Sequence, residues 1–379
     1  MRLIFMLALL LLAFPVPCLA QSGDNLLEQQ FAEQLEASGA QELVDGLDGD
    51  TRALLEDYHL DEISPQSVLE MDSSQLLSLL VQVAQDQVRR PLKLLGTLLA
   101  VTVLGALAAS FQPASDKAMA RLYENITVLA AAAVSVSSVL EVVRQTAVTV
   151  QDGAYFMVSF VPVFAGILTA SGQAVSAGAY HVAVFALCQI IAQTAVSVLI
   201  PLLDCYLAFS VVAGFSSSLS FGKAAQLIRK GTVFLFTLLL TTLIGLLSLQ
   251  GLVAGQVDQA VSKTAKYLVS SLVPVVGSAV SDALATVKSC LSLLKSCVGA
   301  FGIFAVFAAF LPDLVGCLLW MGTMQVAVFA AGVLGMDKLS KLYEAMASVL
   351  TILFSILLSV MLLFIITAAV MMILGGRVS

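Results

Sequence analysis

Apolar residues dominate this chain in long runs that short polar stretches interrupt. The runs fall near residues 92–110, 122–143, 156–172, 180–200, 202–219, 231–252, 267–286, 290–311, 314–335 and 348–374. A helix of about 20 apolar residues crosses the hydrocarbon core of a bilayer. The pattern therefore predicts an all-α fold, a polytopic membrane helical bundle with about ten spans in a multipass domain over residues 89–379.

The composition supports this class. The chain has 379 residues, of which 59% are hydrophobic and 11% charged, and its mean hydropathy is +1.00. Soluble domains carry about 25% charged residues. A soluble globular protein is therefore excluded, and the lipid bilayer is the expected environment of most of the chain.

Residues 1–20 have the order of a secretory signal peptide. Arg2 is followed by the apolar run 3–14 and by Cys18-Leu19-Ala20, a small-x-small cleavage site. This order predicts cleavage before Gln21. An uncleaved first anchor is the alternative, although the apolar run is short for a span.

Residues 21–88 form an acidic region. They hold fifteen of the 25 acidic residues and one basic residue, Arg52. Apolar positions such as Phe31 and Leu35 recur at helical spacing. The region is predicted to be a small helical extracytoplasmic segment, either a cap on the membrane domain or a module that binds a partner. Nothing in it indicates nucleic-acid binding.

Loop charges predict the orientation of the spans. Basic residues are more frequent in one set of loops, for example Lys223, Arg229 and Lys230, and the positive-inside rule makes that set cytoplasmic. Arg89, Arg90 and Lys93 lie on the predicted outer side and oppose the rule.

An internal repeat is visible in the membrane domain. Tyr155, Ser159 and Pro162 match Tyr267, Ser271 and Pro274 in the same register, 112 residues apart. The match predicts two tandem units, roughly 120–220 and 231–335. If each Val-Pro-Val segment re-enters the membrane instead of crossing it, the two units become inverted.

Two further prolines fit the repeat. Pro201 and Pro312 are each predicted to end one span and open the next, and Asp204 and Asp313 after them are predicted to be ordinary turn residues.

The paired Val-Pro-Val segments are the candidate functional site. Proline interrupts a helix, and helices broken at equivalent places in two repeats mark transport sites near the bilayer midplane. A carboxylate within or near a span is costly and marks either function or an ion pair. Kinked helices that pack closely through small residues are the alternative interpretation. The candidate residues are Ser159, Pro162, Gly166, Ser271, Pro274, Gly277 and Asp282.

Motifs of enzymes are missing from the sequence. Its two histidines, His59 and His181, are too few and too far apart for a metal cluster, and no G-x-S-x-G nucleophile motif occurs. The run from Gly214 to Lys223 fails the P-loop spacing, and Asp204 and Asp313 lack an aspartyl-protease context. We expect no catalytic activity, no metal and no cofactor.

The order of motifs resembles a known family. A signal peptide and an acidic helical region precede S-F-V-P-V-F and T-A-S-G, and later K-Y-L-V-S-S-L-V-P-V-V-G-S-A-V-S-D-A (266–283) and L-K-S-C-V-G (294–299). This set is similar to stage III sporulation protein AE. The resemblance implies a multipass protein in the mother-cell membrane around the forespore of an endospore-forming bacterium. It also implies partners, namely other multipass subunits, secretion-type ring proteins and a cytoplasmic ATPase.

Three functions are consistent with these features. The first is a non-enzymatic membrane subunit of the channel complex that links mother cell and forespore, forming or bracing a conduit. The second is a stand-alone secondary transporter whose site lies between the two Pro-broken spans. The third is a scaffold that recruits ring and ATPase partners.

Overall fold

The structure, a computed structural model, describes residues 25–57, 63–64, 73–111, 117–215, 223, 226–238, 241–242, 245 and 277–374. Every regular element in these ranges is helical, which confirms the all-α prediction. The predicted signal peptide, Ser271 and Pro274 lie outside the described residues. The elements are Asn25–Ala37 (α2), Glu42–Asp45 (α3), Gly49–Asp57 (α4), Ser73–Gln87 (α6), Arg89–Ser110 (α7), Lys117–Ala170 (α8), Ala174–Thr194 (α9), the π-helical turn Ala195–Leu199 (η1), Ile200–Phe215 (α10), Gly277–Val333 (α12) and Asp337–Leu374 (α13).

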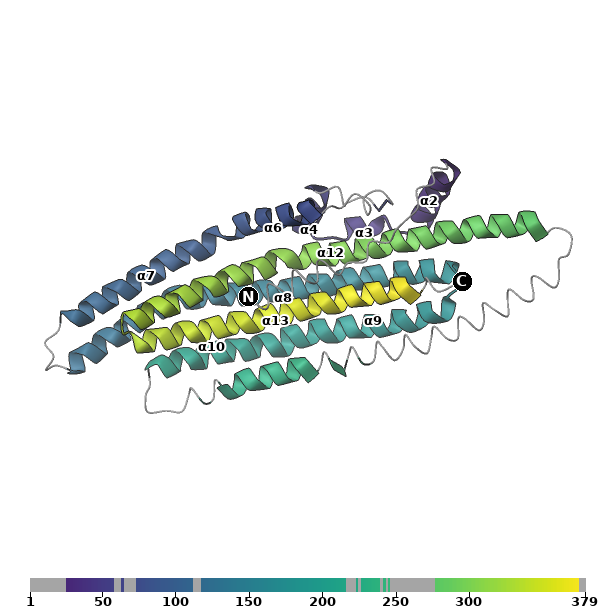
Figure 1. Cartoon of the computed structure of the whole chain (residues 1–379). Coiled ribbons are helices and arrows are strands. Elements are labelled where there is room, and N and C mark those ends of the chain that lie inside the picture. Colours follow the sequence, from purple (N-terminus) through teal and green to yellow (C-terminus); the bar gives the residue numbers. More distant parts are fainter. Residues whose placement is uncertain are drawn as a thin grey trace.

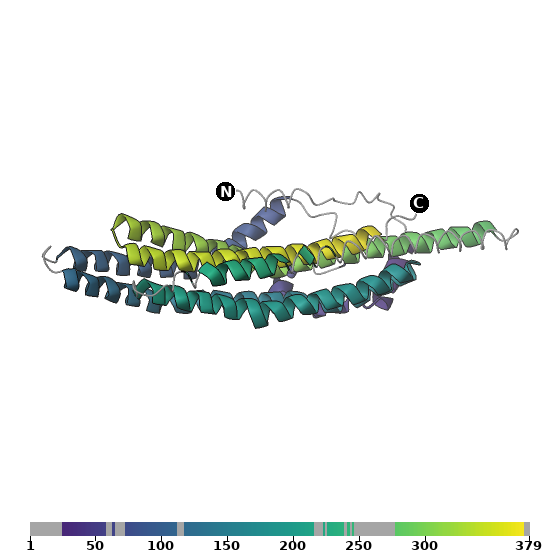
Figure 2. The same cartoon turned by 90° about the horizontal axis from the view of Figure 1, so that it is seen from below.

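The long helices lie side by side in one elongated bundle. Figure 1 shows α8, α9, α12 and α13 nearly parallel to one another, with α6 and α7 along one side of α12. Figure 2 shows the same alignment from below, so the arrangement does not depend on the viewing direction. The core consists of apolar side chains from α8, α12 and α13, and Phe310 and Phe364 meet edge to face with ring centroids 6.1 Å apart.

Two glycines in the left-handed conformation end the long helices. Gly172 after α8 has φ +84°, and Gly335 after α12 has φ +70°. In both turns the following residue donates back into the helix, Gln173 to the Leu168 carbonyl and Met336 to the Ala331 carbonyl, each at 2.9 Å. These are Schellman caps, in which glycine avoids the Cβ penalty of this conformation. They produce the tight α8–α9 and α12–α13 hairpins that align the bundle.

Five helices are long and apolar enough to cross a membrane among the described residues. This supports a polytopic membrane protein. The segments are Arg89–Ser110, Leu122–Ala170, His181–Val212, Ser289–Val333 and Asp337–Met372. The count of about ten spans and the tandem repeat remain predictions.

The two longest described helices far exceed the length that one crossing requires. α8 has 54 residues and α12 has 57, so at 1.5 Å per residue each is about 80 Å long. The hydrocarbon core of a bilayer is only about 30 Å thick. Each helix joins two of the predicted apolar segments, 122–143 with 156–172 in α8 and 290–311 with 314–335 in α12.

At the described prolines the structure contradicts a helix break or a span end, because the helix continues through each of them, and a kink at Pro162 stays a prediction. Pro162 lies inside α8 and Pro312 inside α12, and Pro201 is the second residue of α10, which follows η1 without a loop. An interior proline costs roughly 3 kcal/mol. Burial of a large apolar side chain is worth about 1.5–3 kcal/mol, and Phe160 and Phe164 beside Pro162 are both fully buried. Packing therefore outweighs the local preference to stop.

The acidic N-terminal region is helical and lies on the bundle. Helices α2, α4 and α6 contact α12 along the same side (Figure 1). Apolar residues spaced along these helices face inward, including Phe31, Leu35, Leu55 and Leu79, while the acidic positions remain exposed. The region therefore covers part of α12, and its export across the membrane stays a prediction.

Candidate functional site

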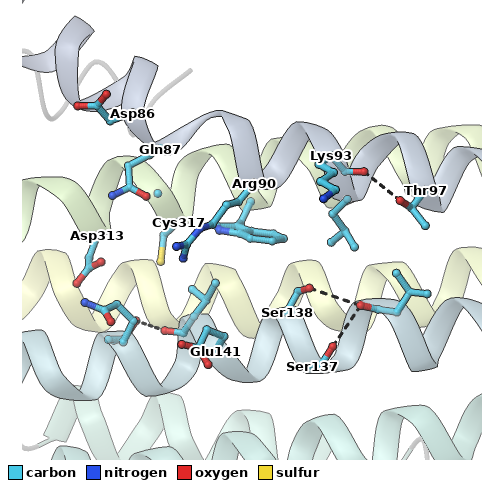
Figure 3. A pocket seen from close by; sticks show the side chains of 17 residues that line it. Asp86, Gln87, Arg90, Lys93, Thr97, Ser137, Ser138, Glu141, Asp313 and Cys317 are labelled. Carbon is cyan, nitrogen blue, oxygen red and sulfur yellow. Dashed lines mark hydrogen bonds between the residues drawn. The ribbon is translucent and has the colours of Figure 1, made fainter.

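A polar cavity lies between α7, α8 and α12, in the middle of the long helices. Its volume is about 740 Å³, and its lining includes five charged side chains. Figure 3 shows how the three helices surround it and which labelled side chains face one another. This cavity gathers charged and hydroxyl side chains from three of the described membrane helices.

The wall formed by α7 is cationic. Arg90, Lys93 and Thr97 follow one another at helical spacing, so they share one face of α7 and line the cavity. Pro91 sits in the first turn of α7, where its missing N–H has no helical partner to lose. The helix therefore begins at this point, which places Arg90 and Lys93 at one end of α7. In Figure 3 the Arg90 guanidinium reaches toward the α12 side, where Cys317 and Asp313 lie.

The opposite wall is acidic. Glu141 comes from α8 and Asp313 from α12. Asp86 at the end of α6 lies at the rim on the same side as Arg90, so one carboxylate also lies beside the cations (Figure 3). The Thr149 hydroxyl of α8 donates a hydrogen bond to the Asp313 carboxylate. This bond joins the two antiparallel long helices and fixes the orientation of the Asp313 carboxylate.

Hydroxyl groups of the cavity donate their protons to their own helices. Thr97 donates to the Lys93 carbonyl at 3.1 Å, and Thr146 to the Val142 carbonyl at 2.9 Å. Ser137 and Ser138 make longer contacts to the Val134 carbonyl, at 3.4 and 3.5 Å. A hydroxyl whose proton is used in this way presents its lone pairs as acceptors. The α8 wall therefore offers acceptors in addition to its carboxylate.

The charges of the cavity do not pair with one another. Ion pairs in the described part of the chain join Arg52 to Asp45 and Glu56, and Lys338 to Glu124, all outside the cavity. Arg90 and Lys93 thus line the same cavity as Glu141 and Asp313 without forming an ion pair with them. Ionisable groups in membrane helices are costly and usually have a partner or a function. The separation of opposite charges across a cavity is the main chemical feature of this site.

The structure separates the predicted site residues from this cavity. Ser159, Pro162 and Gly166 lie on one exposed face of α8, with Tyr155, which is 67% exposed. The opposite face of the same segment carries the buried Phe160. Among the described residues, a Cβ added at Gly166 would meet nothing within 4 Å, so the alternative of close packing has no support at this position there.

The second predicted segment is described only in part. Ser271 and Pro274 lie outside the described residues, Gly277 is the first residue of α12, and Asp282 lies in its second turn. Whether these residues approach Pro162 stays a prediction.

Sequence reasoning missed the residues of the cavity. The sequence predicts Asp313 in an outer turn after Pro312, whereas it is partly buried within α12. In the sequence, Arg90 and Lys93 stand out only as exceptions to the positive-inside rule, and no motif marks Glu141 as a candidate site residue. A carboxylate near the end of an apolar run is a signal of function, and it could have identified Glu141 and Asp313, two of these four cavity residues.

Metal and thiol chemistry have little support in the described ranges. These residues contain no group of three or more His, Cys, Asp or Glu side chains that could hold a metal ion. Cys317 lines the cavity but is buried, and Cys188, Cys290 and Cys297 are buried apolar packing residues.

Comparison with known proteins identifies the family. The family model of stage III sporulation protein AE matches residues 58–375. The chain belongs to this family. It is also 26% identical over 212 residues to stage III sporulation protein AE of Bacillus subtilis (strain 168), an alignment that covers 56% of this chain and 53% of that protein. The match thus spans about half the length of the curated relative.

Membership of the stage III sporulation protein AE family supports a role in sporulation, and the apolar helices support a membrane location. No solved structure matches the chain. The charged cavity is therefore described from this chain alone.

Proposed function

We propose that this chain is a multipass membrane subunit of a sporulation channel complex that links mother cell and forespore, where it forms or braces a conduit. The observation that carries the proposal is the family match over residues 58–375, in a chain whose described part includes five helices long enough to cross a membrane. In this proposal the chain resides in the mother-cell membrane around the forespore, and its acidic N-terminal region is extracytoplasmic.

The form of the bundle supports a role within a larger assembly. Large apolar side chains remain exposed along α7 and α9, including Leu104 at 66% and Val182 at 69%. Lipid covers such side chains within a bilayer. The much longer helices α8 and α12 also carry exposed apolar side chains, such as Leu129 and Phe329, and exceed the roughly 30 Å of one hydrocarbon core. Neighbouring subunits would cover the remainder. The proposed partners are other stage III multipass and ring proteins and a cytoplasmic ATPase.

A stand-alone secondary transporter is the competing function. The sequence suggests a transporter because of a pair of Pro-broken helices. This argument loses support because α8 continues through Pro162. The charged cavity between α7, α8 and α12 gives it another basis, since solute sites in transporters lie between helices near the bilayer midplane.

Affinity purification in mild detergent tests the proposal. A tagged chain expressed at its native level in the endospore-forming host is expected to retain the ring proteins and the ATPase during sporulation. Solute flux in liposomes that contain only the purified chain would favour the transporter instead. Retention of no partner, together with such flux, would contradict the channel subunit.

A further inference from the structure

The charged groups of the central cavity are sorted by sign. The cations, Arg90 and Lys93, come from α7, and the carboxylates, Glu141 and Asp313, come from α8 and α12. Asp86 at the rim is the remaining charged residue of the lining. The acceptor hydroxyls of Ser137, Ser138 and Thr146 are on the acidic side.

A ligand with one sign of charge fits this arrangement poorly. An anion beside Arg90 and Lys93 would face the carboxylates across the cavity, and a cation beside Glu141 and Asp313 would face the guanidinium and the ammonium. Like charges repel, although solvent weakens the repulsion here because Arg90, Lys93 and Glu141 are exposed and Asp313 is partly buried. A ligand that carries both signs at opposite ends meets a complementary group at each wall.

We propose that this cavity binds a zwitterion, a small molecule or headgroup with an anionic carboxylate or phosphate at one end and a protonated amine at the other. Arg90 and Lys93 bind the anionic end, because a guanidinium donates two parallel hydrogen bonds to a carboxylate or phosphate. Asp313 and Glu141 accept from the amine, and the hydroxyl lone pairs of α8 accept its remaining protons.

The size of the cavity agrees with such a ligand. Sites for small molecules range from about 300 to 1,000 Å³, and this cavity of about 740 Å³ lies within that range. The Thr149–Asp313 bond holds one carboxylate in place before a ligand arrives. A site oriented in advance loses less freedom on binding.

The ligand has two sources, a soluble amino acid or the headgroup of a phosphoethanolamine lipid. The inference deepens the proposed function and rests on it only for the biological role of the ligand. Binding is measured on the purified chain, so failure of binding and failure of complex formation are separate results.

The test uses the full chain in a mild detergent and isothermal titration with alanine and phosphoethanolamine as zwitterions. Acetate and inorganic phosphate, which carry only the anionic group, and ethanolamine, which carries only the amine, serve as the single-charge halves of these ligands. We expect at least one zwitterion to bind at least about tenfold more tightly than either of its halves. Nanodiscs with and without phosphatidylethanolamine distinguish a lipid ligand from a soluble amino acid. A bound lipid headgroup would occupy the cavity in the nanodiscs that contain this lipid, so neither phosphoethanolamine nor alanine would bind there.

Two variants and two controls locate the site. Arg90→Gln and Asp313→Asn each remove one charge of the cavity, and asparagine keeps an acceptor for Thr149. Arg89→Gln and Asp152→Asn remove matched charges from exposed positions outside the lining. We expect the first pair to weaken zwitterion binding by about tenfold or more and the controls to change it less than about twofold.

Several results would overturn the proposal. These are no binding of any zwitterion from either source, equal binding of a single-charge half, or equal effects of Arg89→Gln and Arg90→Gln. Circular dichroism and the unfolding midpoint check that each variant is folded. If Arg90→Gln does not fold, Lys93→Gln takes its place, with weakened binding expected. Arg90→Lys is then expected to bind less tightly than the parent, because lysine keeps the charge but cannot donate two parallel hydrogen bonds.

Discussion

Gly302 of α12 lies directly against the Phe160 ring of α8. A Cβ added to Gly302 would be 2.6 Å from Cζ of that ring, closer than any ordinary contact. The ring has no room to move, since Phe160 is fully buried with Phe156 and Phe164 at centroid distances of 5.8 and 5.5 Å. Gly153 makes the corresponding contact with Phe310 from the other helix. These two glycines set how closely α8 and α12 approach.

Gly302→Ala is therefore expected to lower stability. Overpacking a filled core costs about 1–3 kcal/mol, so the unfolding midpoint in detergent and the amount of folded membrane protein should both fall. Gly322→Ala is the matched control in the same helix, where an added Cβ meets nothing within 4 Å. Alanine favours a helix interior by about 0.5–1 kcal/mol over glycine, so this control should be neutral or slightly stabilising. Equal effects of the two variants would refute the close contact.

A buried hydrogen bond joins α7 to α13. The hydroxyls of Thr102 and Tyr343 are 3.2 Å apart, and Thr102 also donates to the Leu98 carbonyl at 2.6 Å. Because that bond uses the Thr102 proton, Tyr343 is the donor of the pair. Tyr343→Phe should reduce the free energy of unfolding by about 0.5–1.5 kcal/mol, the usual net worth of one bond.

Tyr155→Phe is the control for this change. Tyr155 is 67% exposed, and loss of its hydroxyl should leave the unfolding midpoint unchanged. A double variant with Thr102→Val measures the coupling between the two hydroxyls. Thr102→Val should lower the free energy of unfolding less in the Tyr343→Phe background than in the parent, because the bond between the two hydroxyls is already lost there. Additive effects of the two changes would show that this contact contributes nothing.

The sequence predicts where helices form better than where they end. The apolar segments of α8 and α12 are helical as predicted, but the kink or break predicted at Pro162 and the span end predicted at Pro312 follow a local rule. The structure overrides that rule because Phe160, Phe164 and Phe310 are buried on either side of the prolines. Helix continuation depends on this tertiary packing, which no local pattern contains.

The charged cavity could not be predicted from the sequence for the same reason. Glu141 and Asp313 can be noticed as carboxylates in apolar surroundings, but nothing in the sequence pairs them with Arg90. Their meeting depends on the antiparallel register of α8 and α12, which contacts such as Thr149 to Asp313 and Gly302 to Phe160 reveal. That register is a property of the packed bundle.

The predicted orientation is open to cysteine labelling. Among the described cysteines only Cys205 is exposed, so Cys205→Ser removes most of the background. In that variant, Asp50→Cys should react with an impermeant maleimide in intact cells, because residues 21–90 are predicted to be extracytoplasmic. Gln226→Cys should react only after lysis, because the basic loop 222–230 is predicted to be cytoplasmic. Both positions are exposed. Labelling of Gln226→Cys in intact cells would reverse the topology.

The exposed face of α8 that carries Ser159, Pro162 and Gly166 has no packing role within the described chain, which makes its function directly testable. Pro162→Ala restores a backbone donor in the middle of α8, so the variant should be as stable as the parent or more stable. If Pro162 and Pro274 shape a conduit or a partner surface, the double variant Pro162→Ala, Pro274→Ala should lower spore yield while membrane protein levels stay normal. Gly277→Leu adds bulk at the start of α12 and should act in the same direction.

Spore counts and membrane protein levels are measured on the same cultures, because this separates function from folding. A variant whose protein level falls in proportion to spore yield indicates a packing role. Gly332→Ala, a change in α12 where an added Cβ meets nothing within 4 Å, should sporulate normally. Normal spore yield from the double proline variant would remove the reason for placing a functional site on this face, and the cavity between α7, α8 and α12 would remain as the candidate.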